Sequence, residues 1–174
     1  MKTLPAVSII GWSGAGKTTL VERLVPELRS RGLRVGVVKH SSDAHPLHRA
    51  GSDTARFEQG GAALVAFATP AGVQLSVSDA PEQALLPLLE RFRDRVDVVL
   101  VEGWKDGPLP KLEVWREDHG PLLASTRSDV LAVVTDEPRL PEGAPTGLLR
   151  FGTTELPGLA EFITRLARGQ THES

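Results

Sequence analysis

The sequence of 174 residues contains no cysteine and no tyrosine, and only 5% of it is aromatic. Without cysteine, the chain can form no disulfide bond, no thiolate metal ligand and no thiol nucleophile. It also lacks an excess of positive charge, because 20 Lys and Arg residues stand against 22 Asp and Glu residues. Proteins that bind DNA or RNA non-specifically depend on such an excess. The composition therefore argues against thiol chemistry and against a nucleic-acid partner.

Long hydrophobic runs are missing as well. No apolar run approaches the roughly 20 residues of a membrane-spanning helix, so we expect no membrane partner. The first residues lack the apolar segment and cleavage site of a secretory signal peptide. Hydrophobic residues still make up 40% of the chain, which is enough for a packed core. We expect a cytoplasmic protein with a single globular domain over residues 1–169 and a frayed tail over residues 170–174.

Apolar patterns of strand and helix type follow one another along the chain. The apolar run at 6–11, the helical spacing of leucines at 17–31 and the apolar run at 34–39 predict a strand, a helix and a parallel strand. Further strands are expected at 62–68, 73–77, 96–101, 111–115, 130–135 and 148–151, and further helices at 53–59, 81–94 and 159–168. The pattern predicts an α/β domain, a mostly parallel sheet flanked by helices, with an antiparallel hairpin inserted around residues 69–72.

The loop between the first strand and the first helix carries a phosphate-binding motif. Residues Gly11 to Thr18 read GWSGAGKT and match GxxxxGK[ST] at every fixed position. In such loops, backbone amides and a helix N-terminus converge on an anion. We expect Lys17 along the β- and γ-phosphates and the Thr18 hydroxyl on Mg²⁺. The alternative is a glycine turn that caps a helix, with Lys17 in solvent; the flanking strand and helix favour a P-loop NTPase domain.

A P-loop protein also needs a carboxylate at the end of a neighbouring strand to hold the metal. Glu102 follows the apolar run at 96–101, at the edge where open α/β sheets bind ligands, whereas Asp97 lies at the opposite end. We therefore expect Glu102 at the metal and the Gly103 amide near the γ-phosphate. An ordinary surface acid at a strand end is the alternative.

Several further motifs accompany the phosphate loop. They are VVKH at 37–40, GSDTAR at 51–56, GGA at 60–62, VEGWK at 101–105 and PKLEV at 110–114. Together they resemble the MobB family, the molybdopterin-guanine dinucleotide biosynthesis adaptor proteins, from the first strand to about Asp136. The phosphate loop alone is generic, whereas the later motifs in combination are much more selective.

The resemblance implies a small homodimeric protein that binds GTP and Mg²⁺, hydrolyses GTP slowly and acts mainly as an adaptor. In the family, it assists the guanylyltransferase that joins GMP to molybdopterin, which forms the guanine dinucleotide form of the molybdenum cofactor. Molybdopterin itself and molybdoenzymes are further candidate partners.

The sequence motifs and the resemblance together predict a nucleotide site, residue by residue. Lys17 and Glu102 are the catalytic candidates, and Thr18 and Glu102 are the candidate Mg²⁺ ligands. The expected nucleotide-binding residues are Gly11, Ser13, Gly14, Ala15, Gly16, Lys17, Thr18, Thr19, Lys39, His40, Asp53, Arg56, Gly103 and Asp136.

Two parts of this site stay open in the sequence. Asp136 follows the strand at 130–135 and could accept hydrogen bonds from guanine, or it could simply begin a turn. Family members often carry further histidines and acids after the KH pair, whereas residues 41–48 of this chain, which follow His40, read SSDAHPLH, with His45 and His48 as the histidines of that stretch. These three histidines could bind Zn²⁺, although their spacing matches no tight metal-binding pattern, which favours a polar loop that closes over the nucleotide.

Two other functions remain as alternatives. A small-molecule kinase could hold its acceptor against Arg49, Arg56 or the arginines at 91, 93 and 95, although the last three also suit the end of a helix. The second alternative is a nucleotide-gated binding module without turnover, because no hydrolytic glutamine or arginine finger of known placement is evident in the sequence. A homodimer is expected because the hairpin at 64–77 and the strand at 111–115 would leave apolar edges to be covered.

Overall fold

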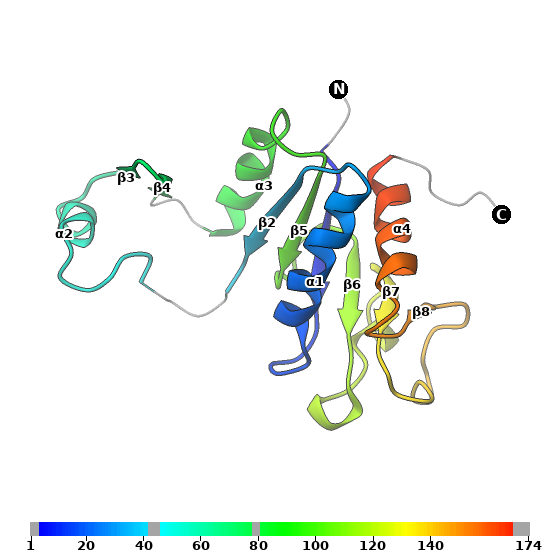
Figure 1. The fold of residues 1–174 in the computed structure, drawn as a ribbon. Coiled ribbons are helices and arrows are strands. Elements are labelled where there is room, and N and C mark those ends of the chain that lie inside the picture. Colours follow the sequence, from blue (N-terminus) through cyan, green and yellow to red (C-terminus); the bar gives the residue numbers. More distant parts are fainter. Residues whose placement is uncertain (1–3, 42–45, 78–80, 169–174) are drawn as a thin grey trace. The chain divides into compact units, whose positions relative to one another are not determined.

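The computed structural model describes residues 4–41, 46–77 and 81–168 (Figure 1). The chain forms two compact units. One comprises Met1–His40 with Leu88–Ser174, and the other comprises Ser41–Pro87. His45 and the tail at 170–174 lie outside the described residues. No helix in the described part of the chain has both the length and the apolar character needed to cross a membrane.

A parallel sheet of six strands is the centre of the larger unit. Its strands are β1 (Ala6–Ile10), β2 (Val35–Lys39), β5 (Val98–Glu102), β6 (Lys111–Val114), β7 (Val130–Val134) and β8 (Leu149–Phe151). They lie in the order β2-β5-β1-β6-β7-β8. Each strand was expected from the sequence, and the predicted fold class is confirmed. The expected apolar edge at 111–115 is wrong, because β6 lies between β1 and β7 in the interior of the sheet.

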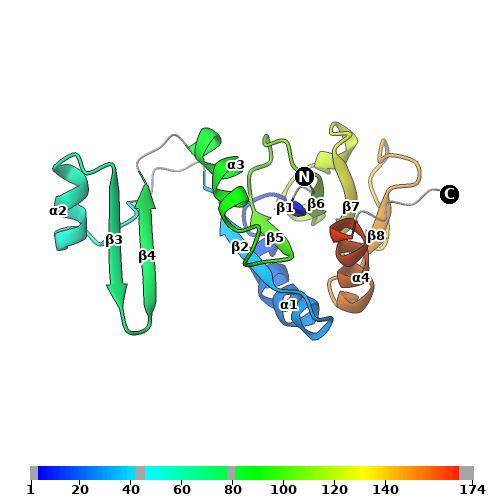
Figure 2. The same ribbon diagram turned by 90° about the horizontal axis from the view of Figure 1, so that it is seen from above.

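Helices α1 (Lys17–Ser30) and α4 (Leu156–Ala167) pack on the same face of this sheet (Figure 2). Leu24 and Leu28 of α1 and Leu159 and Ile163 of α4 are fully buried, and they follow helical spacing. Helix α4 begins before the predicted start at 159, because Pro157 fits a first helical turn.

The opposite face carries a smaller apolar cluster. It consists of Ile10, Trp115, Leu122, Ala124, Val130 and Val133. Two short 3₁₀ helices, η1 (Glu117–His119) and η2 (Leu123–Ser125), belong to the chain that returns from β6 to β7. This connection contributes core residues although it has little regular structure.

The smaller unit contains helix α2 (Asp53–Gln59) and the antiparallel hairpin of β3 (Leu64–Thr69) and β4 (Gly72–Val77). The Ser52 hydroxyl accepts a hydrogen bond from the Ala55 amide at 3.3 Å, which caps α2. Both the helix and the hairpin were expected from the sequence. Helix α3 (Pro81–Arg91) is shorter than the predicted 81–94, and the division between the two units falls within it.

Two charged residues of the PKLEV motif are buried in β6. The ammonium of Lys111 donates to the carbonyls of Gly107 and Leu109, both at 2.8 Å, and to a carboxylate oxygen of Asp129 at 2.5 Å. All three protons of this ammonium are therefore used. Lys111 thus fixes the loop that joins β5 to β6, which is a structural role.

The carboxylate of Glu113 binds the turn that contains η2. Its oxygens accept hydrogen bonds from the amides of Leu123, at 2.7 Å, and Ala124, at 2.8 Å. Burial raises the pKa of Glu113 above its ordinary value of 4.5, although both amide bonds oppose that rise.

The raised pKa of Glu113 predicts a pH-dependent stability difference between the natural protein and Glu113→Gln. A group whose pKa is raised by folding stabilises the native state fully below its unfolded pKa. This contribution is lost as the pH rises through the folded pKa. We expect the unfolding free energy of the natural protein, relative to the variant, to fall as the pH rises from below about 4.5. Urea unfolding over a pH series measures it.

The exposed Glu142 provides the control, because Glu142→Gln also removes one negative charge. The difference in unfolding free energy between Glu142→Gln and the natural protein should not show the pH dependence expected for Glu113→Gln. A difference for Glu113→Gln that is constant over the pH series would contradict the burial argument.

Candidate nucleotide site

The glycine-rich loop at residues 11–16 connects β1 directly to α1. Gly16 precedes the helix with φ 102°, and no side chain caps the first amides of α1. The first amides of a helix have no partner within the helix, and the helix dipole favours negative charge near them. At the start of the loop, a Cβ on Gly11 would lie 2.2 Å from the carbonyl oxygen of Val114. Only glycine therefore fits where β1 passes the end of β6.

Lys17 lies over its own loop. Its ammonium donates to the carbonyl oxygens of Gly11, at 3.0 Å, and Trp12, at 2.9 Å. Burial lowers the pKa of Lys17, and the nearby Glu102 carboxylate opposes this effect. Two of the three ammonium protons are therefore held by the loop, which leaves the third for an anion above it.

Thr18 and Glu102 meet at the carboxyl edge of the sheet. The Thr18 hydroxyl donates to Glu102 Oε1 at 2.8 Å, and Lys39 Nζ lies 3.8 Å from the same oxygen. The register explains this meeting, because Glu102 is aligned with Ile9 of β1 on one side and with Lys39 of β2 on the other. The residues that sequence analysis selected on three separate segments therefore lie together.

The oxygens of Thr18 and Glu102 fit Mg²⁺, which prefers oxygen ligands and usually takes few of them from protein. Among the described residues, no group of three or more His, Cys, Asp or Glu side chains could hold a metal ion. The chemistry of this oxygen pair suits a metal whose other ligands are phosphates and water.

The chain beyond Glu102 turns sharply. Gly103 has φ 92° and Trp104 has φ 58°, a backbone conformation that is rare outside glycine. The Trp104 side chain is buried, and its ring centroid lies 5.9 Å from that of His40. The Gly103 amide donates to the Ile9 carbonyl at 2.9 Å, so the expected contact with a γ-phosphate requires that this bond be exchanged.

Comparison with known proteins agrees with this geometry. The sequence model of the MobB family, described as "Molybdopterin guanine dinucleotide synthesis protein B", matches residues 6–136. The chain belongs to the MobB family. A Haemophilus influenzae "Molybdopterin-guanine dinucleotide biosynthesis adapter protein" is 37% identical over 78% of this chain and 76% of its own length. The Escherichia coli protein of the same name is 31% identical over 96% of this chain and 95% of its own length.

Solved structures of MobB proteins have the same fold. The crystal structure of Bacillus subtilis MobB has a TM-score of 0.71 at 25% identity and covers 98% of this chain and 99% of its own. A crystal structure described as "molybdopterin-guanine biosynthesis protein B (mobB)" has a TM-score of 0.67 at 31% identity and covers 94% and 99%. The resemblance found in the sequence motifs is therefore confirmed at the level of family and fold.

In this MobB chain, the connection that follows β6 packs on the phosphate loop. Sequence analysis missed this contact. Arg116 Nε donates to the Ala15 carbonyl at 3.1 Å, and Trp12 Nε1 donates to the Pro121 carbonyl at 2.7 Å. The ring of His119 lies beside Gly14, where an added Cβ would be 2.9 Å from its Nε2 atom. Only the adjacency of β1 and β6 brings these residues together, and no local motif signals it.

Asp136 binds the turn before α4. Its Oδ1 atom accepts from the Thr153 amide at 2.8 Å, and its Oδ2 atom accepts from the Thr153 hydroxyl. These bonds hold the pKa of Asp136 below its ordinary value, so the carboxylate is ionised at neutral pH. Asp136 does not itself begin a turn, as the sequence alternative had it, but binds the turn at Thr153; the guanine role stays a prediction.

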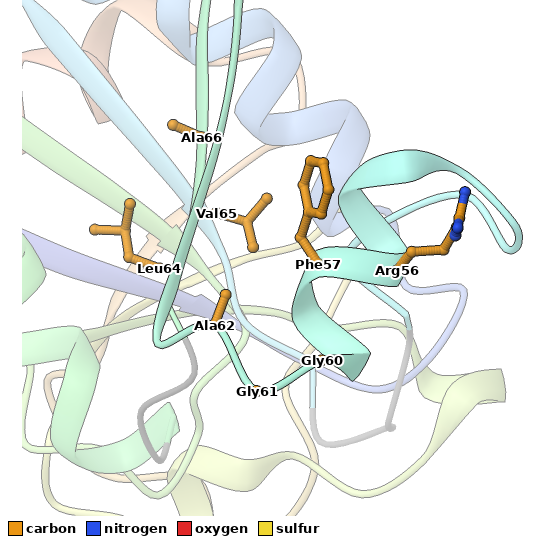
Figure 3. A pocket seen from close by; sticks show the side chains of 8 residues that line it. All are labelled: Arg56, Phe57, Gly60, Gly61, Ala62, Leu64, Val65 and Ala66. Atoms are coloured by element: carbon orange, nitrogen blue, oxygen red, sulfur yellow. The ribbon is translucent and has the colours of Figure 1, made fainter.

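Asp53 and Arg56 lie in the smaller unit, on helix α2. Their charged groups form an exposed ion pair at 3.6 Å. Arg56 and Phe57 line a hollow of about 620 Å³ between α2 and the start of the hairpin, and Figure 3 shows Arg56 extending away from the labelled hairpin residues. Their expected part in the nucleotide site stays a prediction. The less favoured Zn²⁺ alternative for the three histidines is not tested, because His45 lies outside the described residues.

The close approach of Gly103 to the end of β2 predicts a specific loss of stability. A Cβ on Gly103 would lie 2.5 Å from the His40 carbonyl oxygen. Gly32 has a similar φ, 80°, but an added Cβ there meets nothing within 4 Å. We expect Gly32→Ala to cost about 1–2 kcal/mol from backbone strain alone. Gly103→Ala should cost roughly 1–3 kcal/mol more, because the clash is with backbone.

Urea unfolding of the two variants measures this difference. Equal losses for Gly103→Ala and Gly32→Ala would contradict the proposed clash. Because the φ angles of Gly32 and Gly103 are similar, the Gly32 variant accounts for the cost of a positive φ in the comparison.

Proposed function

We propose that this protein binds GTP with Mg²⁺ at the carboxyl edge of its parallel sheet, hydrolyses it slowly and serves as an adaptor in the formation of molybdopterin guanine dinucleotide. One observation carries the proposal: the Thr18 hydroxyl and the Glu102 carboxylate meet at 2.8 Å beside a phosphate loop. The names of the Haemophilus influenzae and Escherichia coli relatives support the pathway.

Each residue of this group has a distinct task in the proposal. Lys17 neutralises charge on the β- and γ-phosphates, and the free amides at the start of α1 bind phosphate oxygens. Thr18 and Glu102 hold Mg²⁺, which neutralises phosphate charge when bound. Lys39 Nζ lies 3.8 Å from Glu102 Oε1, and its positive charge helps to orient that carboxylate.

Slow hydrolysis of GTP is expected from the residues next to Glu102, the proposed Mg²⁺ ligand. Gly103 and Trp104 come directly after Glu102, and neither side chain can accept a proton from an attacking water. Glu102 itself is engaged by Thr18 and Lys39. An adaptor whose nucleotide state changes slowly suits this arrangement better than a kinase does. Arg93, one of the arginines considered for a kinase acceptor, forms an ion pair with Glu90.

A homodimer is part of the proposal, and the hairpin supplies its surface. The residues on one face of β3 and β4 are apolar without exception: Leu64, Ala66, Ala68, Val73, Leu75 and Val77. Most of them are exposed within their unit; Val73 is 71% exposed and Leu75 is 51% exposed. A second copy of the chain would cover this hairpin face. We propose a molybdenum cofactor guanylyltransferase as the main partner, with molybdopterin or molybdoenzymes as further ones, in the cytoplasm.

The proposal predicts that Lys17→Ala weakens GTP binding while the fold is retained. Loss of a charge-assisted hydrogen bond to phosphate should raise the dissociation constant about 10- to 100-fold. Titration of GTP, with and without Mg²⁺, can be followed by tryptophan fluorescence, because Trp12 lies in the loop and Trp104 follows Glu102. Arg29→Ala removes an exposed positive charge from the last turn of the same helix and should leave the affinity unchanged.

Titration with ATP, together with assays of phosphate release, metabolite phosphorylation and partner association, separates the alternative functions. Preference for GTP over ATP, slow phosphate release and association with a guanylyltransferase are expected. Phosphorylation of a metabolite at many turnovers per second would identify a kinase instead. Nucleotide binding without phosphate release over hours, even with the partner, would identify a gated module. Full affinity in Lys17→Ala would contradict the site itself.

The hairpin face predicts a dimer that Leu75→Asp disrupts. A carboxylate at the centre of an apolar interface loses its hydration without a partner, so the dimer should dissociate. Light scattering coupled to size exclusion measures the mass. Gln74→Asp places the same charge on the same strand, but on the face opposite to Leu75, and should leave the dimer intact. A natural protein that is monomeric at high concentration would contradict the dimer.

A further inference from the structure

Arg116 contacts the phosphate loop and lies close enough to Asp136 to affect its pKa, but the proposed function gives it no task. It is the second residue after β6, and its Nε atom donates to the Ala15 carbonyl at 3.1 Å. The guanidinium also passes Gly16, since a Cβ there would lie 3.7 Å from Arg116 Nη2. Arg116 is exposed, and its two terminal nitrogens make no hydrogen bond or ion pair with any described residue. The side chain is therefore anchored at one end and open at the other.

The order of strands sets the direction of a bound nucleotide. Glu102 follows β5, on one side of β1, so the metal and the β- and γ-phosphates belong on that side of the loop. The base must then extend toward the other side, over the ends of β6 and β7. Neighbouring strands are about 4.8 Å apart, which puts the end of β7 roughly 10 Å from the end of β1. That span suits a ribose and its base.

Two groups of opposite chemistry stand at those strand ends. Arg116 follows β6 and carries only hydrogen-bond donors. Asp136 follows β7 and, as a carboxylate, carries only acceptors. They are close enough for Arg116 to contribute to the lowered pKa of Asp136, in which the bonds to Thr153 are the main cause.

This pairing matches guanine and not adenine. Guanine presents two acceptors, O6 and N7, on one edge, and the same edge of adenine presents an acceptor at N7 and a donor at its amino group. A guanidinium can therefore make two hydrogen bonds to guanine, whereas one of its N–H groups would face the amino group of adenine. The N1–H and 2-amino donors of guanine fit the carboxylate of Asp136.

We propose that Arg116 selects the base: its terminal nitrogens donate to O6 and N7 of a 6-oxopurine while Nε remains on the Ala15 carbonyl. This inference rests on the proposed GTP-binding function and gives it a specificity-determining residue. The inference also links the base to the phosphate loop, because the Arg116 side chain would contact both. A 6-oxopurine is then recognised by the same side chain that braces the loop.

Affinities of the full-length protein for GTP, ITP, 7-deaza-GTP and ATP test the inference, for the natural protein and for Arg116→Ala. ITP keeps O6 and N7 but lacks the 2-amino group, and 7-deaza-GTP lacks the N7 acceptor. We expect Arg116→Ala to weaken GTP and ITP about tenfold or more, the usual scale of a two-bond contact to guanine, and to leave ATP within about twofold. The natural protein should bind 7-deaza-GTP more weakly than GTP, and Arg116→Ala should bind the two equally.

Arg150→Ala is the matched control. Arg150 also lowers the pKa of Asp136, but its guanidinium donates to the carbonyls of Glu137 and Pro138. Removal of this charge should leave the preference for GTP over ATP unchanged. Asp136→Asn should weaken GTP more than ITP, because only GTP has the 2-amino donor.

The outcomes separate the inference from the function on which it rests. Equal weakening of all four nucleotides in Arg116→Ala would mean that Arg116 acts only on the loop or the phosphates, and would overturn the inference. An unchanged preference of Arg116→Ala for GTP over ATP would also overturn the inference. If Arg116→Ala fails to fold, equal binding of GTP and 7-deaza-GTP by the natural protein overturns the inference. A natural protein that binds GTP and ATP equally contradicts the proposed function itself.

Discussion

The carboxylate of Glu102 is the interaction on which the candidate site depends. It ends a strand that lies between β1 and β2, so the side chains that follow all three strands meet at one edge. Glu102 Oε1 accepts from Thr18 and lies 3.8 Å from Lys39 Nζ, which ties α1, β2 and β5 together at this edge. A parallel sheet produces this meeting because all its strands end on the same side. Without Glu102, two cationic side chains, those of Lys17 and Lys39, would be left without a compensating charge.

The family motifs divide into residues for chemistry and residues for structure. Lys111 and Glu113 belong to one of the selective motifs, yet both are fully buried and hydrogen-bonded: Lys111 to two loop carbonyls and Asp129, and Glu113 to two amides. Lys111 fixes the loop that follows β5 and Glu102, and Glu113 fixes the turn beyond η1. Arg116, two residues after the motif ends, contacts the phosphate loop. The motif therefore builds the frame that holds Arg116 at the loop.

Sequence reasoning succeeded where the signal is local. The strand before the glycine-rich loop and the helix after it lie where they were expected, and Glu102 ends β5 beside that loop. It missed Arg116, Trp12 and His119 as one contact region, because this contact requires β1 and β6 to be neighbours, and strand order is set by packing over the whole sheet. The expected apolar edge at 111–115 failed for the same reason. The start of α4 was placed too late because its first turn contains proline and glycine, which weaken a helical pattern.

The loop is prepared for a nucleotide without a change of backbone. Lys17 holds the Gly11 and Trp12 carbonyls, and the amides at the start of α1 have no side-chain cap, so donors already face the space that phosphates would fill. Replacement of the bond between Thr18 and Glu102 by bonds to Mg²⁺ needs only side-chain rotation. The Gly103 amide differs, since it must leave the Ile9 carbonyl to reach a γ-phosphate. Gly103 and Trp104 already have positive φ, so the strained turn after Glu102 is the element that a third phosphate would move. In the proposed function, a diphosphate would leave this turn in place, so a partner would meet two different states of the adaptor.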